Sequence, residues 1–310
     1  MPAAAPTHTE PGSSQAADDV SRGLMLGALG VLIFAATLPM TRLAVGAADA
    51  PQLPPAFVTA GRAAVAGLLS LAYLLLLRAP LPARRHWRAL AISALGTVVG
   101  FPLFLALALR RVDAMHAAVV TGVLPLATAA AAALMLRQRA SAGFWVCALL
   151  GCALVIAYAA WQGSGALSLA DALLLLAVLS AAIGYVGGAQ VSASVPAPQV
   201  ICWVLVLSLP LVLPAAWWLR PQQPATAAAW GGFAYVSLFS MWLGFFAWYR
   251  GLVLGGVMRV SQVQLLQPFI ALLLAVPILG ERLDLATVGF ALAVMAVVFI
   301  GRRMPSGARR

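Results

Sequence analysis

Hydrophobic residues run along this chain in long uninterrupted stretches, separated by short segments rich in Pro, Gly and Arg. A window of about 19 residues, which is suited to membrane helices, detects ten such stretches. Each has about the 20 residues that an α-helix needs to cross a hydrocarbon core of about 30 Å. The predicted spans are residues 23–44, 54–77, 87–109, 114–136, 143–161, 168–190, 198–219, 226–249, 256–279 and 285–303.

The first stretch shares one feature with a signal peptide, because Ala48-Asp49-Ala50 follows it like a cleavage site. Its apolar run is longer than a signal-peptide core, which has about 7–15 residues. We therefore expect this segment to remain in the protein as a membrane helix. Residues 1–22, rich in Pro, Ala, Ser and Thr, are expected to form a disordered cytoplasmic tail.

The second half of the chain repeats the first at low identity. An offset of 143 residues superposes 114–158 on 257–301 without a gap and places Pro125 on Pro268. An offset of 148 lays the first span on the sixth. Because each half has an odd number of spans, the halves must enter the membrane in opposite senses, as in alternating-access transporters. The predicted organisation is a tail at 1–22, repeats at 23–161 and 162–303, and a cytoplasmic tail at 304–310.

Composition excludes an ordinary soluble domain. Hydrophobic residues make up 63% of the chain and charged residues 9%, and no Lys is present. A soluble domain has about 25% charged residues, so the expected environment of this chain is a lipid bilayer. The net charge of +11 does not indicate nucleic-acid binding, because the Arg residues stand singly or in pairs between apolar runs.

The distribution of Arg predicts the orientation. With the N-terminus in the cytoplasm, twelve Arg residues fall inside and five outside, which obeys the positive-inside rule. Both termini are therefore expected in the cytoplasm. The twelve are Arg22, Arg78, Arg84, Arg85, Arg88, Arg137, Arg139, Arg250, Arg302, Arg303, Arg309 and Arg310, and the five are Arg42, Arg110, Arg111, Arg220 and Arg282.

Residues suited to catalysis are scarce. Only eight acidic residues occur, none of them in the middle of a predicted span, and there is no zinc, nucleophile-elbow or phosphate-loop motif. The three cysteines, Cys147, Cys152 and Cys202, lie in apolar runs without a CxxC pair. We therefore expect neither an enzyme nor a bound metal or cofactor.

Several motifs give the chain a family resemblance over about residues 23–303. They are Leu38-Pro39-Met40-Thr41-Arg42-Leu43-Ala44, Phe57-Val58-Thr59-Ala60-Gly61-Arg62, Trp248-Tyr249-Arg250-Gly251, Gln267-Pro268 and Leu279-Gly280-Glu281-Arg282-Leu283. With these motifs the chain resembles the EamA-type carriers of the drug/metabolite transporter superfamily. The resemblance implies a ten-helix exporter of small metabolites in the bacterial inner membrane. The first half departs from the pattern, since Arg137-Gln138-Arg139 stands where the second half has Gly280-Glu281-Arg282.

Polar, aromatic and helix-breaking residues within the spans predict where a substrate binds. Amide side chains in hydrocarbon must face the bundle interior or a water-filled cavity, although the same residues could serve as hydrogen-bonding contacts between helices. The candidate substrate-binding residues are Tyr185, Gln190, Tyr235, Trp242, Gln262 and Gln267. The candidate helix breaks, which would act in gating, are Pro39, Pro125, Gly187, Gly188 and Pro268.

Two further residues are ambiguous. His116 is the candidate for proton coupling, because its ordinary pKa of about 6.5 lies near neutrality, although a residue at a helix end can simply contact interfacial water. Arg62 lies deep in the second span. It either has a structural role or attracts an anionic group of the substrate.

The favoured function is a secondary transporter that exports small metabolites, such as amino acids or related amphipathic compounds, by alternating access. Concentration-driven transport is preferred over proton antiport, because no carboxylate lies at mid-membrane. The alternatives are an exporter of lipophilic cations and a membrane scaffold that transports nothing. The sequence leaves the substrate and the oligomeric state open, a homodimer included.

Overall fold

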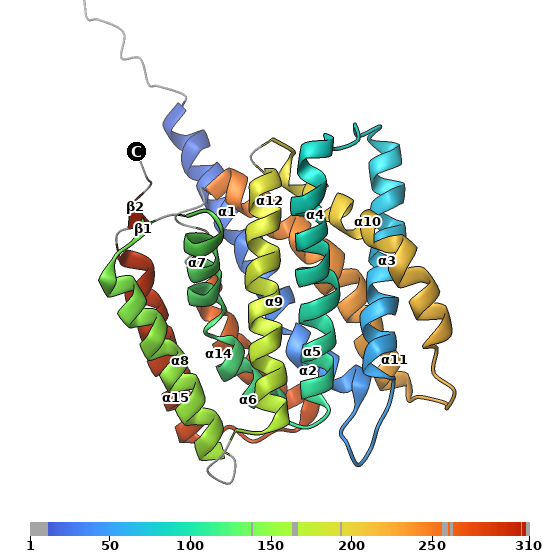
Figure 1. Cartoon of the computed structure of the whole chain (residues 1–310), viewed down its shortest axis with the longest axis vertical. Helices are drawn as coiled ribbons and strands as arrows, with labels where there is room; N and C mark the ends of the chain where they lie inside the picture. The colour runs from blue at the N-terminus through green and yellow to red at the C-terminus, as the bar shows by residue number, and fades with distance from the viewer. Residues whose placement is uncertain are drawn as a thin grey trace, which may run out of the picture.

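The computed structural model describes residues 12–137, 139–162, 167–192, 194–255, 260, 263–304 and 306–307, and it is a bundle of helices (Figure 1). Within this described part, nine helical segments are long and apolar enough to cross a membrane, and a shorter apolar helix covers Gln264–Leu279. The nine are Asp18–Val45, Pro55–Leu76, Arg84–Leu109, Ala114–Met135, Ala142–Gln162, Leu169–Ser192, Ala197–Trp218, Ala227–Gly255 and Leu285–Arg303. The predicted all-helical membrane fold is confirmed. The predicted span at 256–279 is described only in part, because 256–259, 261 and 262 lie outside the described residues.

Five of the predicted spans are single helices in the structure. They are α3 (Pro55–Leu76), α8 (Ala142–Gln162), α9 (Leu169–Ser192), α10 (Ala197–Trp218) and α15 (Leu285–Arg303). Their long runs of Leu, Ala and Val contain no residue that interrupts a helix, apart from Pro210 and Pro214 in α10. Leucine and alanine favour helix intrinsically, and in a bilayer the helix also satisfies every backbone polar group internally.

The other spans change geometry part-way, and prolines explain most of these changes. The first span divides at Ala36 into α1 (Gly12–Ala35) and α2 (Thr37–Val45), and the fourth divides into α6 (Ala114–Thr121) and α7 (Leu124–Met135). In the ninth, a 3₁₀ turn η4 (Gln264–Leu266) precedes α14 (Gln267–Leu279). Proline has no backbone N–H and clashes with the preceding turn.

The third and eighth spans contain π-helical turns at matching places. One span consists of η1 (Arg84–His86), α4 (Trp87–Ser93), the π segment η2 (Ala94–Gly100) and α5 (Phe101–Leu109). The other consists of α11 (Ala227–Tyr235), the π segment η3 (Val236–Leu243) and α12 (Gly244–Gly255). The offset of 143 residues found in the sequence places one π segment on the other.

Helix packing has the symmetry of an inverted repeat. The second span packs on the seventh (α3 on α10), the fourth on the ninth (α6 on α14) and the fifth on the tenth (α8 on α15). The first span packs on the eighth (α1 on α12). The sixth span, which corresponds to the first in the repeat, packs on the third (α9 on α5 and η2). Exchanging the two halves leaves this set of contacts unchanged, as a two-fold axis between them requires. Figure 1 shows α8 beside α15 on one flank and α3 beside α10 on the other.

Glycines permit close crossings in two pairs of spans. A Cβ at Gly184 of α9 would lie 2.8 Å from the backbone N of Thr97, and one at Gly23 of α1 would lie 2.1 Å from that of Gly255. Contacts this short leave no room for a side chain. Small residues at membrane helix interfaces have this effect in general, and here the two pairs of spans correspond in the repeat, although the glycines occupy different positions along them.

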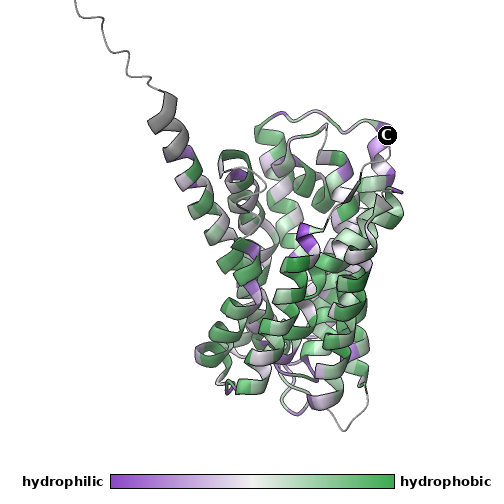
Figure 2. Cartoon of the chain, turned by 90° about the vertical axis from the view of Figure 1, so that its left-hand side faces the viewer, coloured by the Kyte–Doolittle hydropathy of each residue, from purple (hydrophilic) through white to green (hydrophobic). Residues whose placement is uncertain are grey.

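Hydrophobic residues predominate in the helices along the length of the bundle (Figure 2). Leu75, Leu149 and Leu273 are each more than 60% exposed, which is typical of lipid-facing side chains. The start of α1 and the end of α15 lie at the same end of the molecule, which is the end that carries both termini (Figure 1). There a two-residue strand β1 (Arg139–Ala140) pairs antiparallel with β2 (Ser306–Gly307), joining the first repeat to the C-terminal segment.

Candidate functional site

A cavity of about 230 Å³ lies between the two interrupted helices of the fourth and ninth spans. Residues around both helix breaks form its walls, and α2, α9 and α15 complete it. The lining residues are Leu38, Ala118, Thr121, Gly122, Leu124, Pro125, Thr128, Tyr185, Gln264, Gln267, Pro268, Ala271, Met295 and Arg302.

The helix breaks alter the backbone polar groups beside this cavity. Pro125 cannot donate to the carbonyl of Thr121, and Pro268 cannot donate to that of Gln264, because proline has no N–H. Thr121 and Gln264 both line the cavity and are equivalent in the repeat. The carbonyl of Gln264 instead accepts a hydrogen bond from the backbone N of Gln267 in the 3₁₀ turn. A carbonyl that proline leaves without its helical donor is tolerated inside a membrane where it finds another partner or lines a water-filled space, so the broken helices suit a polar cavity.

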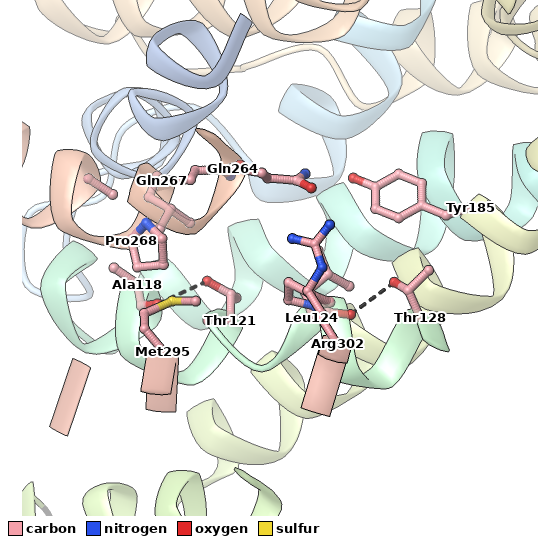
Figure 3. Close-up of a pocket in the computed structure, with 14 residues that line it drawn as sticks. Ala118, Thr121, Leu124, Thr128, Tyr185, Gln264, Gln267, Pro268, Met295 and Arg302 are labelled. Carbon is pink, nitrogen blue, oxygen red and sulfur yellow. Dashed lines mark hydrogen bonds between the residues drawn. The ribbon is translucent and has the colours of Figure 1, made fainter. Parts of the chain in front are cut away.

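Polar side chains converge at one side of this cavity. Figure 3 shows the hydroxyl of Tyr185, the amide of Gln264 and the guanidinium of Arg302 directed toward one another. The hydroxyls of Thr121 and Thr128 instead donate to carbonyls of their own helices, at 2.7 Å from Ala117 and 2.9 Å from Leu124. The remaining lining is mostly apolar, as in many small-molecule sites, where a few polar groups orient an apolar ligand.

Arg62 of α3 is buried near this cavity, with 2% of its surface exposed. Its Nη2 donates to Ser240 Oγ at 3.0 Å, and that hydroxyl shares a hydrogen bond of 2.8 Å with Thr37. Its Nε and Nη1 have no hydrogen-bond partner among the described residues, and no carboxylate there forms an ion pair with it.

A second cavity, of about 450 Å³, lies at the end of the bundle opposite the termini. At its wall His116 Nε2 lies 2.6 Å from Asp171 Oδ1, and both side chains are largely buried. The ring of His116 stacks on that of Tyr158, with 5.2 Å between their centres. The Asp171 carboxylate also accepts hydrogen bonds from the backbone N and the hydroxyl of Ser168. This cluster joins the fourth, fifth and sixth spans.

Glu281 ties the second repeat to the first at this same end. Its two carboxylate oxygens accept hydrogen bonds from the backbone N of Ala114, at 2.7 Å, and of Met115, at 2.8 Å. These are orphan donors at the start of α6, where a negative charge is favourable. Burial raises the pKa of the Glu281 carboxyl, and the two N–H donors oppose that shift.

Asp284 and two arginines add to the contacts at this end. Asp284 caps α15 by accepting from the backbone N and hydroxyl of Thr287, which lowers the pKa of Asp284. Arg42 donates to the carbonyl of Leu109, and Arg110 donates to the carbonyl of Val45 at 3.3 Å. The polar contacts therefore link the spans and loops around the second cavity, at the end opposite the termini.

Comparisons with known proteins agree with this architecture. The EamA-like transporter family matches residues 21–158 and again 168–302, which together make up most of the chain. The chain belongs to the EamA-like transporter family. The uncharacterized transporter YdeK of Bacillus subtilis (strain 168) is 45% identical over 285 residues, covering 91% of this chain and 98% of YdeK. A protein of known crystal structure, 19% identical, covers 91% of this chain and 96% of its own with a TM-score of 0.61, which shows the fold alone.

As a member of the EamA-like family, the chain is a multi-pass membrane transporter, and the central cavity is its candidate substrate site. Four residues singled out in the sequence line that cavity: Tyr185, Gln267, Pro125 and Pro268. Pro39 follows the break at Ala36 but does not line the cavity, while its neighbour Leu38 does. Gln262 lies outside the described residues.

Three of the other candidate binding residues lie elsewhere. Tyr235 donates its hydroxyl to the carbonyl of Ile33 at 3.1 Å and thereby joins α11 to α1. Trp242 packs edge-on against the ring of Tyr73, and Gln190 is exposed near the end of α9. None of the three lines the central cavity. His116 lines the second cavity instead.

The helix break predicted at Gly187 and Gly188 is wrong, because α9 continues through both residues. A Cβ at Gly187 would lie 2.7 Å from the carbonyl oxygen of Ala89, so this glycine permits close packing of α9 on α4. α9 does not use the conformational freedom of these glycines; their lack of a side chain is what the neighbouring helix requires.

Sequence reasoning missed Thr121, Thr128, Gln264 and Arg302 as lining residues. The repeat carries a signal for two of them, since Thr121 and Gln264 each stand four residues before an equivalent proline. Arg302 carries no such signal. The predicted topology places it among the cytoplasmic arginines, and only the folded structure brings its side chain into the cavity.

Proposed function

We propose that this protein is a secondary transporter that moves small amphipathic metabolites, such as amino acids or related compounds, out of the cell by alternating access. The central cavity between the equivalent breaks of the fourth and ninth spans is the observation that carries the proposal. A site at the interface of inverted repeats, formed by discontinuous helices, is the arrangement from which alternating access operates.

The unequal ends of the bundle support a state open toward one side. The cavity extends from Leu38 and Ala118 to Arg302, near the end that carries the termini. The contacts of His116, Asp171 and Glu281 hold the other end together. If the termini are cytoplasmic, the cavity faces the cytoplasm, from which an exporter takes its substrate.

Export from a cytoplasm-facing cavity requires the predicted orientation in the bacterial inner membrane, and cysteine labelling tests it. In a variant whose three native cysteines are replaced, Gln223→Cys should react with an impermeant reagent added to intact cells. Ala83→Cys, an exposed position at the opposite end, should react only after the membrane is opened. The reverse pattern would place the termini outside and contradict export from this state.

Exchange in proteoliposomes tests the transport activity and the site together. Purified protein is reconstituted alone, and counterflow of labelled amino acids and related compounds is measured. Thr121→Trp fills the cavity and should abolish counterflow. Leu149→Trp, on the lipid-facing side of α8 with 70% of the leucine exposed, is the matched control and should retain it.

The two alternatives give different results in the same assay. Folded protein that exchanges no compound would indicate a scaffold, and exchange of lipophilic cations alone would indicate a drug exporter. Equal activity of Thr121→Trp and the control would show that transport bypasses the central cavity.

For the energy source we propose concentration-driven movement, because no described carboxylate lines the central cavity. Uphill accumulation under an imposed pH gradient would contradict this and favour proton antiport. If His116→Ala then abolished only the uphill part, the pair of His116 and Asp171 would be the coupling site. If neither protein accumulated substrate while counterflow persisted, His116 would have a structural role.

A further inference from the structure

The two helix breaks beside the central cavity are equivalent in the repeat but differ in their side chains. The offset of 143 residues places Thr121 on Gln264 and Leu124 on Gln267, and all four residues line the cavity. The break in the ninth span therefore offers two amides where the break in the fourth offers one hydroxyl and one apolar side chain. The second repeat supplies the more polar side of the cavity, and the first repeat supplies the more apolar side.

The polar groups at the two breaks also differ in whether the protein itself satisfies them. The hydroxyls of Thr121 and Thr128 donate to carbonyls of their own helices, at 2.7 Å and 2.9 Å. By contrast, the amides of Gln264 and Gln267 form no hydrogen bond with any part of the chain that the structure describes. Both amide side chains are only partly buried. Because they line the cavity, their polar atoms are accessible to a ligand inside it.

An unpaired amide in a membrane protein needs a partner that offers both kinds of hydrogen bond. Its oxygen accepts and its nitrogen donates, whereas an ionised carboxylate only accepts and an ammonium group only donates. A buried donor or acceptor left without a partner is costly, so a ligand that satisfies both atoms of the amides is favoured over one that satisfies either. The volume of about 230 Å³ is below the roughly 300–1,000 Å³ of sites for drug-sized ligands, which limits the ligand to small compounds.

We propose that Gln264 and Gln267 determine the specificity of the transporter by selecting compounds whose polar end both donates and accepts hydrogen bonds. A primary carboxamide has this property in one group, and an amino acid has it in its neighbouring ammonium and carboxylate groups. The hydroxyl of Tyr185 is directed toward the amide of Gln264 (Figure 3) and bonds to the same polar end. The apolar body of the ligand lies against Leu38 and Leu124 of the first repeat. This inference rests on the proposed transport function and narrows it, because simple acids and simple amines are excluded.

Binding to the purified protein in detergent tests this selection separately from transport. Two series of compounds are built on the carbon skeletons of phenylalanine and leucine, so that only the polar end changes. Each series consists of the amino acid, the carboxamide, carboxylate and methyl ester that lack the amino group, and the amine that lacks the carboxylate. Thermal stabilisation over a range of ligand concentrations gives the dissociation constants. The amino acids and carboxamides should bind at least about tenfold more tightly than the other three, each of which leaves donors or acceptors of the amides unpaired.

Variants taken from the repeat itself test the two amides. Gln264→Thr and Gln267→Leu introduce the residues that stand at the equivalent positions of the fourth span, and both should fold. In the double variant, the preference for carboxamides over methyl esters should fall from about tenfold to within about twofold. Gln190→Leu is the matched control, because it removes an exposed amide outside the cavity, and it should retain the wild-type preference. Size-exclusion chromatography and the melting temperature without ligand check that each variant is folded.

The outcomes separate this inference from the function on which it rests. If the carboxylates or the amines bind as tightly as the carboxamides, or if the double variant and Gln190→Leu show the same preference, selection by the two amides is overturned while transport stands. If none of the compounds stabilises the protein, although counterflow in proteoliposomes detects exchange of another compound, the inference is again overturned. Folded protein that neither binds these compounds nor exchanges any compound would contradict the proposed transport function itself.

Discussion

Two loops that are equivalent in the repeat have opposite characters. The loop after α14 carries Gly280 and Glu281, and Glu281 accepts two hydrogen bonds from the start of α6 in the other repeat. The loop after α7 has Arg137 and Gln138 at the matching positions, so no carboxylate is available there. The helices around the loops obey the symmetry of the repeat, whereas these side chains do not. A transporter built from matching halves can thus favour closure at one end through a few polar residues.

The largest effect should come from the buried cluster at the closed end. Asp171→Ala removes the partner of His116 and the acceptor of two hydrogen bonds from Ser168. We expect a loss of about 3 kcal/mol in stability, since breaking a buried polar pair leaves the other member uncompensated. The measurement is thermal unfolding in detergent, with the exposed Asp49→Ala as control. Equal melting temperatures of the two variants would show that the cluster contributes little to the stability of the protein.

Removing the carboxylate of the Glu281 loop should have the next largest effect. Glu281→Ala leaves the N–H groups of Ala114 and Met115 without their acceptor, at a cost of about 1–2 kcal/mol. It should also increase labelling of a cysteine introduced at Met115, which is 5% exposed in this state. Arg282→Ala changes the neighbouring exposed residue and should alter neither quantity. If the cysteine at position 115 reacted equally in Glu281→Ala and Arg282→Ala, the carboxylate of Glu281 would not be what distinguishes the two loops.

The raised pKa of Glu281 predicts a smaller, pH-dependent effect. Because its pKa is higher in the folded protein than in the unfolded chain, proton binding favours the folded state. The contribution is fully present below the ordinary pKa of about 4.3 and is lost as pH rises through the raised value. Glu281→Gln cannot titrate, so its stability relative to wild type should increase with pH in this window. Melting temperatures measured between pH 4 and 8 test the sign, and a relative decrease would contradict it.

The smallest effect concerns the backbone of the other loop. Arg137 has a φ of 52°, close to the 71° of its equivalent Gly280, and this region is unfavourable for a residue with a side chain. Arg137→Gly should stabilise the protein by about 0.5 kcal/mol, because glycine adopts this conformation freely. Arg137→Ala, which keeps the Cβ, should give no such gain. A loss of stability in the glycine variant would mean that the arginine side chain contributes more than its backbone strain costs.

The sequence alone determined the class of fold. Runs of about 20 apolar residues have one stable solution in a bilayer, a helix that satisfies its own backbone, and the predicted ends lie close to those observed. The sequence also predicted a substrate site among the spans that carry Pro39, Pro125, Gly187-Gly188 and Pro268, because proline interrupts a helix whatever packs against it. The central cavity lies at two of these positions, beside Pro125 and Pro268. Tyr185 and Gln267 follow from the same reasoning, as polar groups in apolar helices that line the cavity.

The tertiary structure decided which polar residues meet. Tyr235 and Trp242 were equally good candidates in the sequence, yet each packs against other helices. Arg302 was indistinguishable from its neighbour Arg303 until the end of α15 brought it alone into the cavity. Gly187 and Gly188 look like a helix break in the sequence, because the helix α4 that packs against them lies 94 or more residues away along the chain. Helix periodicity is a local property that a sequence displays, whereas the partner of a side chain depends on contacts between distant segments.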